Sequence, residues 1–66
     1  MGFDDFLKYC TFDLIPADNN DVKVEVIFSS GFIKKFSKDF VDSNLEVAKK
    51  LTAADLYDCM NHEGVI

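Results

Sequence analysis

Residues 22–36, VKVEVIFSSGFIKKF, decide the fold of this chain. Within residues 22–28 apolar and charged side chains alternate, and this period of two is typical of a half-buried strand. β-branched and aromatic residues dominate the segment, as strands favour. Residues 32–36 repeat the alternation less regularly, and Gly31 supplies the positive φ that a tight hairpin needs. The stretch therefore predicts a β-hairpin that turns at residues 29–31.

The chain before the hairpin predicts a third strand. An isolated two-stranded hairpin is only marginally stable in water, so other segments must cover its apolar face. Residues 3–8 have helical spacing of apolar side chains, and residues 9–15 have strand spacing. Residues 16–21, PADNND, form a loop of turn-favouring types that returns the chain antiparallel into residue 22. We expect a short N-terminal helix and a three-stranded meander.

After residue 36 the pattern becomes helical. The motif Ser43-Asn44-Leu45-Glu46 matches a capping box, and apolar residues then recur at helical spacing. Thr52 opens a second box-like start, which favours two helices near 44–51 and 53–61 over one bent helix. The sequence therefore predicts an α+β fold, a three-stranded antiparallel meander packed against two short C-terminal helices. The shared periodicities predict one buried cluster of Val24, Val26, Phe28, Leu45, Ala48, Leu51 and Leu56.

Length and composition suggest a single domain that is rich in phenylalanine. The chain has 66 residues, 48% of them hydrophobic, and seven are Phe. A domain of this size has little interior. The phenylalanines therefore indicate either a subunit interface, with a homodimer as the expected assembly, or a Phe-rich core in a monomer.

The charge is negative and lacks arginine. Twelve acids oppose seven bases, all of them Lys, and the net charge is −5. Arg is the preferred residue for recognising phosphate and guanine, so this balance argues against direct binding to nucleic acid or to an anionic membrane. It favours a basic protein partner, or solubility alone.

The chemistry-bearing residues are few. Cys10 and Cys59 lie in apolar patterns without a preceding signal peptide, and we expect unpaired thiols in a cytoplasmic protein. Cys59 with His62 falls short of the three or four ligands of a zinc site. A thiol nucleophile would also need a pocket and an orienting group. We expect no metal, no cofactor and no enzymatic activity.

The acids of the helical half are the candidate partner-binding residues. If residues 39–51 form one helix, three carboxylates line one side, and two more extend the row along the next helix. Rows of carboxylates can imitate the phosphates of DNA, which repeat about every 3.4 Å along a strand. An ordinary solvated acidic face is the alternative interpretation. The candidate residues are Asp39, Asp42, Glu46, Asp55 and Asp58.

In size, acidity and lack of a catalytic motif, the chain resembles small acidic bacteriophage proteins that disable host factors by imitating DNA. The resemblance is one of general character and assigns no residue a role. It implies a phage-encoded inhibitor that works in the host cytoplasm. Such a protein would bind a basic DNA-binding host protein, for example an HU-like nucleoid protein, and block its DNA binding. The alternative function is a structural subunit that forms a homo-oligomer through a Phe-rich face.

Overall fold

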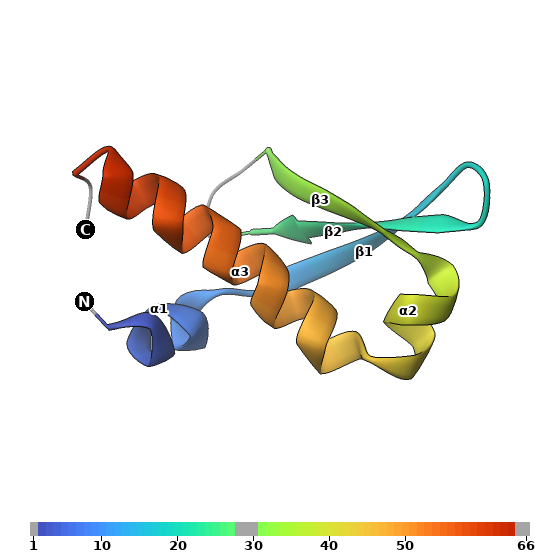
Figure 1. Ribbon diagram of the computed structural model, residues 1–66, viewed down its shortest axis with the longest axis horizontal. Coiled ribbons are helices and arrows are strands. Elements are labelled where there is room, and N and C mark those ends of the chain that lie inside the picture. Colours follow the sequence, from blue (N-terminus) through green and yellow to red (C-terminus); the bar gives the residue numbers. More distant parts are fainter. Residues whose placement is uncertain (1, 28–30, 65–66) are drawn as a thin grey trace.

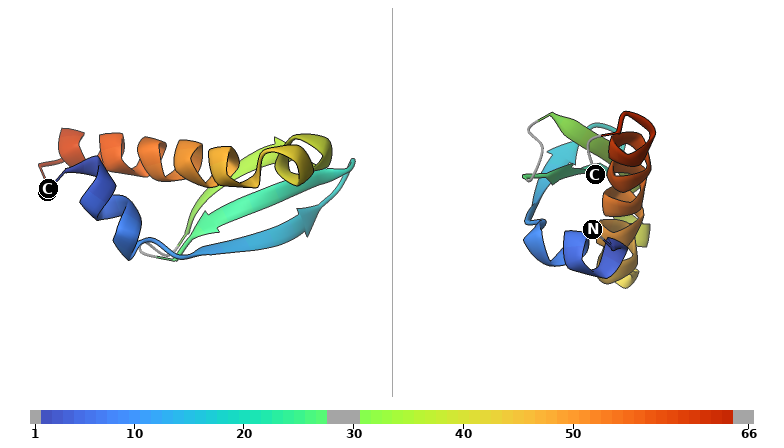
Figure 2. Two further views of the ribbon diagram at one scale, coloured as in Figure 1. Left: turned by 90° about the horizontal axis from the view of Figure 1, so that it is seen from below. Right: turned by 90° about the vertical axis from the view of Figure 1, so that its left-hand side faces the viewer.

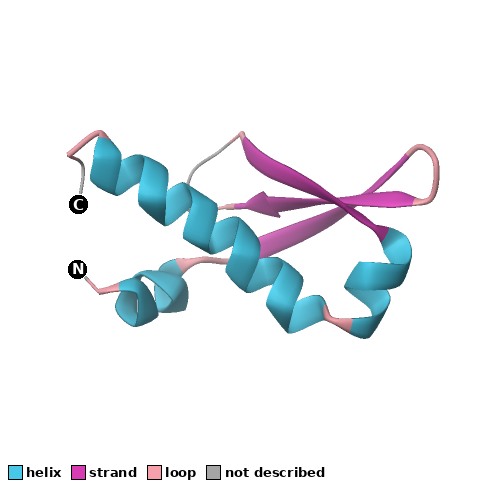
Figure 3. Ribbon diagram, viewed as in Figure 1, coloured by secondary structure: helices cyan, strands magenta, loops and turns pink. Residues whose placement is uncertain are grey.

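The computed structural model describes residues 2–27 and 31–64 and has an α+β fold (Figure 1). The predicted strand 22–28 is therefore described only up to residue 27. Of the predicted turn 29–31, only residue 31 is described. The elements follow the chain in the order α1 (Phe3–Tyr9), β1 (Phe12–Ala17), β2 (Asp21–Val26), β3 (Phe32–Ser37), α2 (Lys38–Ser43) and α3 (Leu45–His62). The strands form an antiparallel sheet in the order β1-β2-β3. The predicted meander is confirmed (Figure 3).

The two faces of the sheet differ in whether the described helices pack on them. Figure 2 shows α2 and α3 on the same side of the sheet, and none of the described elements covers the opposite side. On the helix-covered face, Val24 and Val26 of the central strand are fully buried. Phe12 and Phe32 flank Val26 from the two neighbouring strands. We call the face of the sheet beneath α2 and α3 the covered face, and the opposite face the open face.

The β1–β2 turn is tighter than the sequence predicted. The loop expected over residues 16–21 is reduced to a short turn, because Asn19 and Asn20 adopt positive φ angles of 61° and 63°. Positive φ at successive residues matches the right-handed twist of hairpin strands, and Asn tolerates it better than most residues. Pro16 lies inside β1, opposite Val22. Proline lacks the amide hydrogen but is accommodated here because β1 is an edge strand.

Gly31 has the conformation that the sequence predicted for it. Its φ is +91°, a region that residues with a Cβ rarely adopt. Ser29 and Ser30, the other predicted turn residues, and Phe28 lie outside the described residues.

The helix α2 was not expected from the sequence, and the predicted cap at Ser43 is wrong. Ser37 caps α2, because its side-chain oxygen accepts a hydrogen bond from the Phe40 amide at 3.2 Å. Ser43 is instead the last residue of α2. Asn44, with φ −139° and no side-chain cap, separates α2 from α3.

The predicted helix break at Thr52 is also wrong, since α3 runs without interruption from Leu45 to His62. Thr52 is fully buried, and its hydroxyl donates to the Ala48 carbonyl at 2.8 Å. A threonine hydroxyl can either cap a helix or bond the carbonyl four residues back. Here the second pattern satisfies the hydroxyl within a continuous helix.

The core consists of two clusters rather than the single predicted one. One cluster joins Val24 to Val41 and Ala48, between the sheet and both C-terminal helices. The other joins α1, α3 and the end of β2, with these buried members: Phe6, Cys10, Val26, Ala53 and Leu56. Leu45 packs against the first cluster, whereas Leu51 is 44% exposed and was wrongly assigned to the core.

Aromatic contacts fix α1 against the second half of α3, at the end of the molecule away from α2 (Figures 1 and 2). The Phe3 and Phe6 rings lie 5.5 Å and 5.2 Å from the ring of Tyr57. At the other end, Phe36 of β3 stacks on Phe40 of α2 at 5.6 Å. All six described phenylalanines are buried or half-buried, so they do not form the exposed Phe-rich face that one interpretation of the sequence required.

Candidate functional site

The five acids predicted to bind a partner do not form one row. The segment 39–51 contains two helices instead of one, so Asp39 and Asp42 belong to α2 and Glu46 belongs to α3. Glu46 lies on the flank of α3 that faces α1 and β1, whereas Asp55 bonds Lys34 of β3, at the opposite edge of the sheet. This separation follows from the helix itself, because nine residues at about 100° each place two side chains on opposite faces.

Three of the five acids are held by lysines. The Asp55 carboxylate accepts from the Lys34 amine at 2.6 Å, and Asp42 accepts from Lys38 at 2.9 Å. Glu46 lies 3.9 Å from Lys49. The hydrogen bond and charge of Asp42 raise the pKa of Lys38 above its usual range. Only Asp39 and Asp58 have no lysine in ion-pair range.

More acids than lysines lack an ion-pair partner. Five ion pairs join five different lysines to five different carboxylates, and every charged side chain lies among the described residues. Of twelve acids and seven lysines, seven acids and two lysines are therefore unpaired. The unpaired lysines are Lys23 and Lys50, and the unpaired acids are Asp4, Asp13, Asp18, Glu25, Asp39, Asp58 and Glu63.

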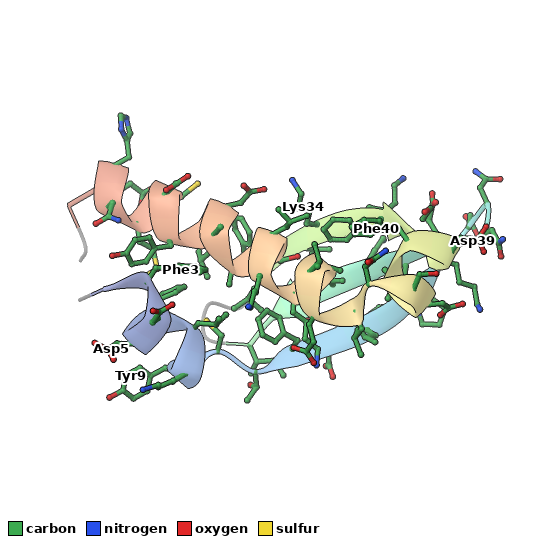
Figure 4. The ribbon with its side chains drawn as sticks, turned by 60° about the horizontal axis from the view of Figure 1, so that its bottom comes forward. Phe3, Asp5, Tyr9, Lys34, Asp39 and Phe40 are labelled. Atoms are coloured by element: carbon green, nitrogen blue, oxygen red, sulfur yellow. The ribbon has the colours of Figure 1, made fainter. Side chains whose placement is uncertain are left out.

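These unpaired carboxylates occur at both ends of the molecule and on the open face. Figure 4 places Asp39 at the end where the β1–β2 turn lies, and that turn is tied to α2 by the Lys38 amide donating to the Asn20 carbonyl at 2.8 Å. Asp18 belongs to the same turn. Asp58 lies near the other end, on the second half of α3, and Glu63 follows the last residue of that helix. The acidic surface is therefore distributed and is not one patch.

Two charged rows, which the sequence did not predict, cross the open face. Asp13 lies opposite Glu25 across β1 and β2, and Lys23 lies opposite Lys35 across β2 and β3. The alternation along β2 already placed Lys23 and Glu25 on one face. Their neighbours across the strands depend on the sheet register, which the periodicity of one strand does not define.

The surface of the described residues includes two hollows of similar size. The larger, of about 450 Å³, lies between the end of α1, the start of β1 and the first half of α3. Its apolar lining includes Leu7 and Phe12, and Lys49 and Lys50 contribute amines. The smaller, of about 390 Å³, adjoins the β1–β2 turn and Lys23. Three of the seven residues that line the first hollow, Glu46, Lys49 and Lys50, are charged, so it lacks the mainly apolar lining of small-ligand sites.

The two thiols lie in different environments. Cys10 is buried, and burial raises the pKa of its thiol, which donates to the Phe6 carbonyl at 3.4 Å. Cys59 is a free thiol too, but it is exposed and does not pack in the core as its apolar pattern suggested. Within residues 2–27 and 31–64, no group of three His, Cys, Asp or Glu side chains is placed to hold a metal ion.

None of the helices in the described part of the chain combines the length and apolar character needed to cross a bilayer. Comparisons of the chain with protein-family models, curated proteins and solved structures find no match.

Proposed function

We propose that this protein is a non-enzymatic interaction protein that binds a basic, nucleic-acid-binding partner and lowers its access to DNA. The observation that carries the proposal is the surplus of seven unpaired carboxylates over two unpaired lysines. The protein works in the cytoplasm, where unpaired thiols such as Cys10 and Cys59 are typical.

The pairing pattern supports a ranking of the acids by their expected contribution to partner binding. An acid already bonded to a lysine, such as Asp42 or Asp55, must exchange that partner for a new one. An unpaired acid loses only its hydration when a partner lysine or arginine arrives. Asp18, Asp39 and Asp58 therefore attract a basic partner more effectively than the paired acids do. Exposed charges of this kind act mainly on the association rate and are screened by salt.

A displacement assay tests the proposal with two charge-matched variants. The probe is a purified HU-like nucleoid protein bound to a fluorescent DNA duplex. The first variant neutralises unpaired acids, with Asp18→Asn, Asp39→Asn and Asp58→Asn. The second neutralises paired acids, with Asp42→Asn, Glu46→Gln and Asp55→Asn. Both variants remove three negative charges, so they share the same net charge.

We expect the wild type to displace the duplex at low salt and to lose this ability as salt is added. The variant that neutralises the unpaired acids should displace the duplex roughly tenfold less well than the wild type does. The variant that neutralises the paired acids should displace it with an efficiency closer to that of the wild type. Equal losses in both variants would show that total charge alone matters. If the wild type failed to displace the duplex at low salt, competition with this class of partner would be contradicted.

A further inference from the structure

The open face of the sheet combines exposed aliphatic side chains with charges in rows. Ile33 of β3 is 44% exposed, and Ile27, which follows β2, is 52% exposed. Ile15 of β1 is half-buried on the same face, where it lies opposite Lys23. None of the described helices packs on this face, so these isoleucines contact solvent (Figure 2). Apolar side chains that gather on an exposed face can mark a protein–protein interaction site.

The charges on the open face form two adjacent rows of opposite sign. The acid row contains Asp13 and Glu25, directly opposite each other, and the lysine row contains Lys23 and Lys35. Like charges directly opposite each other in an antiparallel pair destabilise the sheet. The relief within the molecule is slight, since among the described residues one ion pair lies on this face, between Lys35 and Asp21 at 3.9 Å. The rows are two residues apart along β2, about 7 Å.

We propose that a second copy of this chain covers the open face, so that the protein forms a symmetric dimer with its sheets face to face. In this dimer the two-fold axis runs parallel to the rows and midway between them. It places the row of each copy that contains the acids over the row of the other that contains the lysines. Because β1 then lies over β1 and β3 over β3, opposite charges meet directly on β2. Glu25 then lies opposite Lys23 of the second copy, and Lys23 opposite Glu25 of the second copy. The arrangement is isologous, as most homodimers are.

The charges select this axis over the other two-fold arrangement. A two-fold axis parallel to the strands would place each row over itself, with acids against acids and lysines against lysines. Juxtaposed like charges are strongly unfavourable at an interface. The rows therefore fix the orientation of the second copy, and Ile15, Ile27 and Ile33 supply the apolar area between the sheets.

The size of the face predicts a weak dimer. Three strands about 4.8 Å apart and six residues long cover about 14 Å by 20 Å, or about 300 Å² of flat area on each copy. Stable complexes bury about 800 Å² per partner. Self-association is therefore expected at high protein concentration and is reduced by salt. This inference goes beyond the proposed function, because it needs no other protein.

Opposite charge changes in two variants test the proposal. With Lys23→Glu, carboxylates meet carboxylates at both symmetric positions, and with Glu25→Lys, amines meet amines. Each variant alone should self-associate at least roughly tenfold more weakly than the wild type. When the two variants are mixed, each acid again faces an amine, and association should return. Sedimentation velocity and the concentration dependence of NMR signals report both results, with circular dichroism as the check on folding.

Lys50→Glu is the matched control, since Lys50 is the other unpaired lysine and belongs to α3. It makes the same change in net charge as Lys23→Glu and should leave self-association unchanged. The proposal is overturned if the wild type stays monomeric at millimolar concentration, or if the two folded variants associate no better mixed than alone. The basic-partner proposal would survive either result, because the displacement assay measures a different complex.

Discussion

The covered and open faces of the sheet have the same three strands but opposite environments. On the covered face, Val24 and Val26 are fully buried beneath two helices. On the open face, Lys23 and Glu25 alternate with those valines and have no lysine or acid partner in ion-pair range. The described helices therefore bury one face of the sheet and leave the other exposed to solvent. Stability is concentrated on the covered face, and the surface that we propose for self-association is the open face.

The largest expected effect contrasts one substitution on each face. Val26→Asp places an unpaired carboxylate in the core and should destabilise the domain by on the order of 4 kcal/mol, enough to unfold most of a small protein. Ile33→Asp makes the same kind of change on the open face and should cost about 1 kcal/mol or less. Urea unfolding followed by circular dichroism compares the two variants. Comparable losses would contradict the division between the faces.

The covering helix provides the next largest effect. If α3 is continuous through Thr52, Ala54→Pro removes a helical hydrogen bond and should cost about 3 kcal/mol. If a new helix began after Thr52, proline in its first turn would be tolerated. Ala54→Gly is the milder comparison, at about 1 kcal/mol. A proline variant as stable as the wild type would contradict a continuous α3.

The cap of α2 gives a smaller effect with an internal control. Ser37→Ala removes the hydrogen bond accepted from the Phe40 amide and should cost about 1 kcal/mol. Ser43→Ala is the control, because Ser43 ends α2 and caps neither helix. Thermal unfolding of the two variants should give a lower melting temperature for the Ser37 variant alone. The opposite order would restore the cap that the sequence predicted.

The smallest expected effect concerns the buried thiol. Because burial raises the pKa of Cys10 above 9.0, the unfolded chain ionises at lower pH than the folded one. The contribution of the neutral thiol to the unfolding free energy is therefore fully present below pH 9.0. It is lost as the pH rises through the pKa of Cys10 in the folded state. Cys10→Ala should flatten this decline, measured as unfolding free energy against pH. A Cys59→Ala variant, which alters only an exposed thiol, should retain it.

The strands were predictable because apolar side chains repeat at a period of two. The conformation of Gly31 was predictable because few other residues adopt its φ. The helical half was predicted less well, since Ser37, Ser43 and Thr52 all suit a cap and only tertiary contacts decide among them. The charged rows could not be predicted, because Asp13 meets Glu25 only through the register of two strands. The ion pair of Lys34 with Asp55 could not be predicted either, because it depends on how α3 packs on the sheet.

The most direct test of the account is a dilution series of wild-type amide NMR spectra at low salt. The account predicts that signals of the open face, those of Lys23, Glu25 and Ile33, shift with protein concentration, and that added salt reverses the shifts. Val47 and Leu51, which are 46% and 44% exposed on α3, serve as apolar reference positions and should not shift. Shifts confined to α3, or none at any concentration, would contradict the claim that the open face is a binding surface.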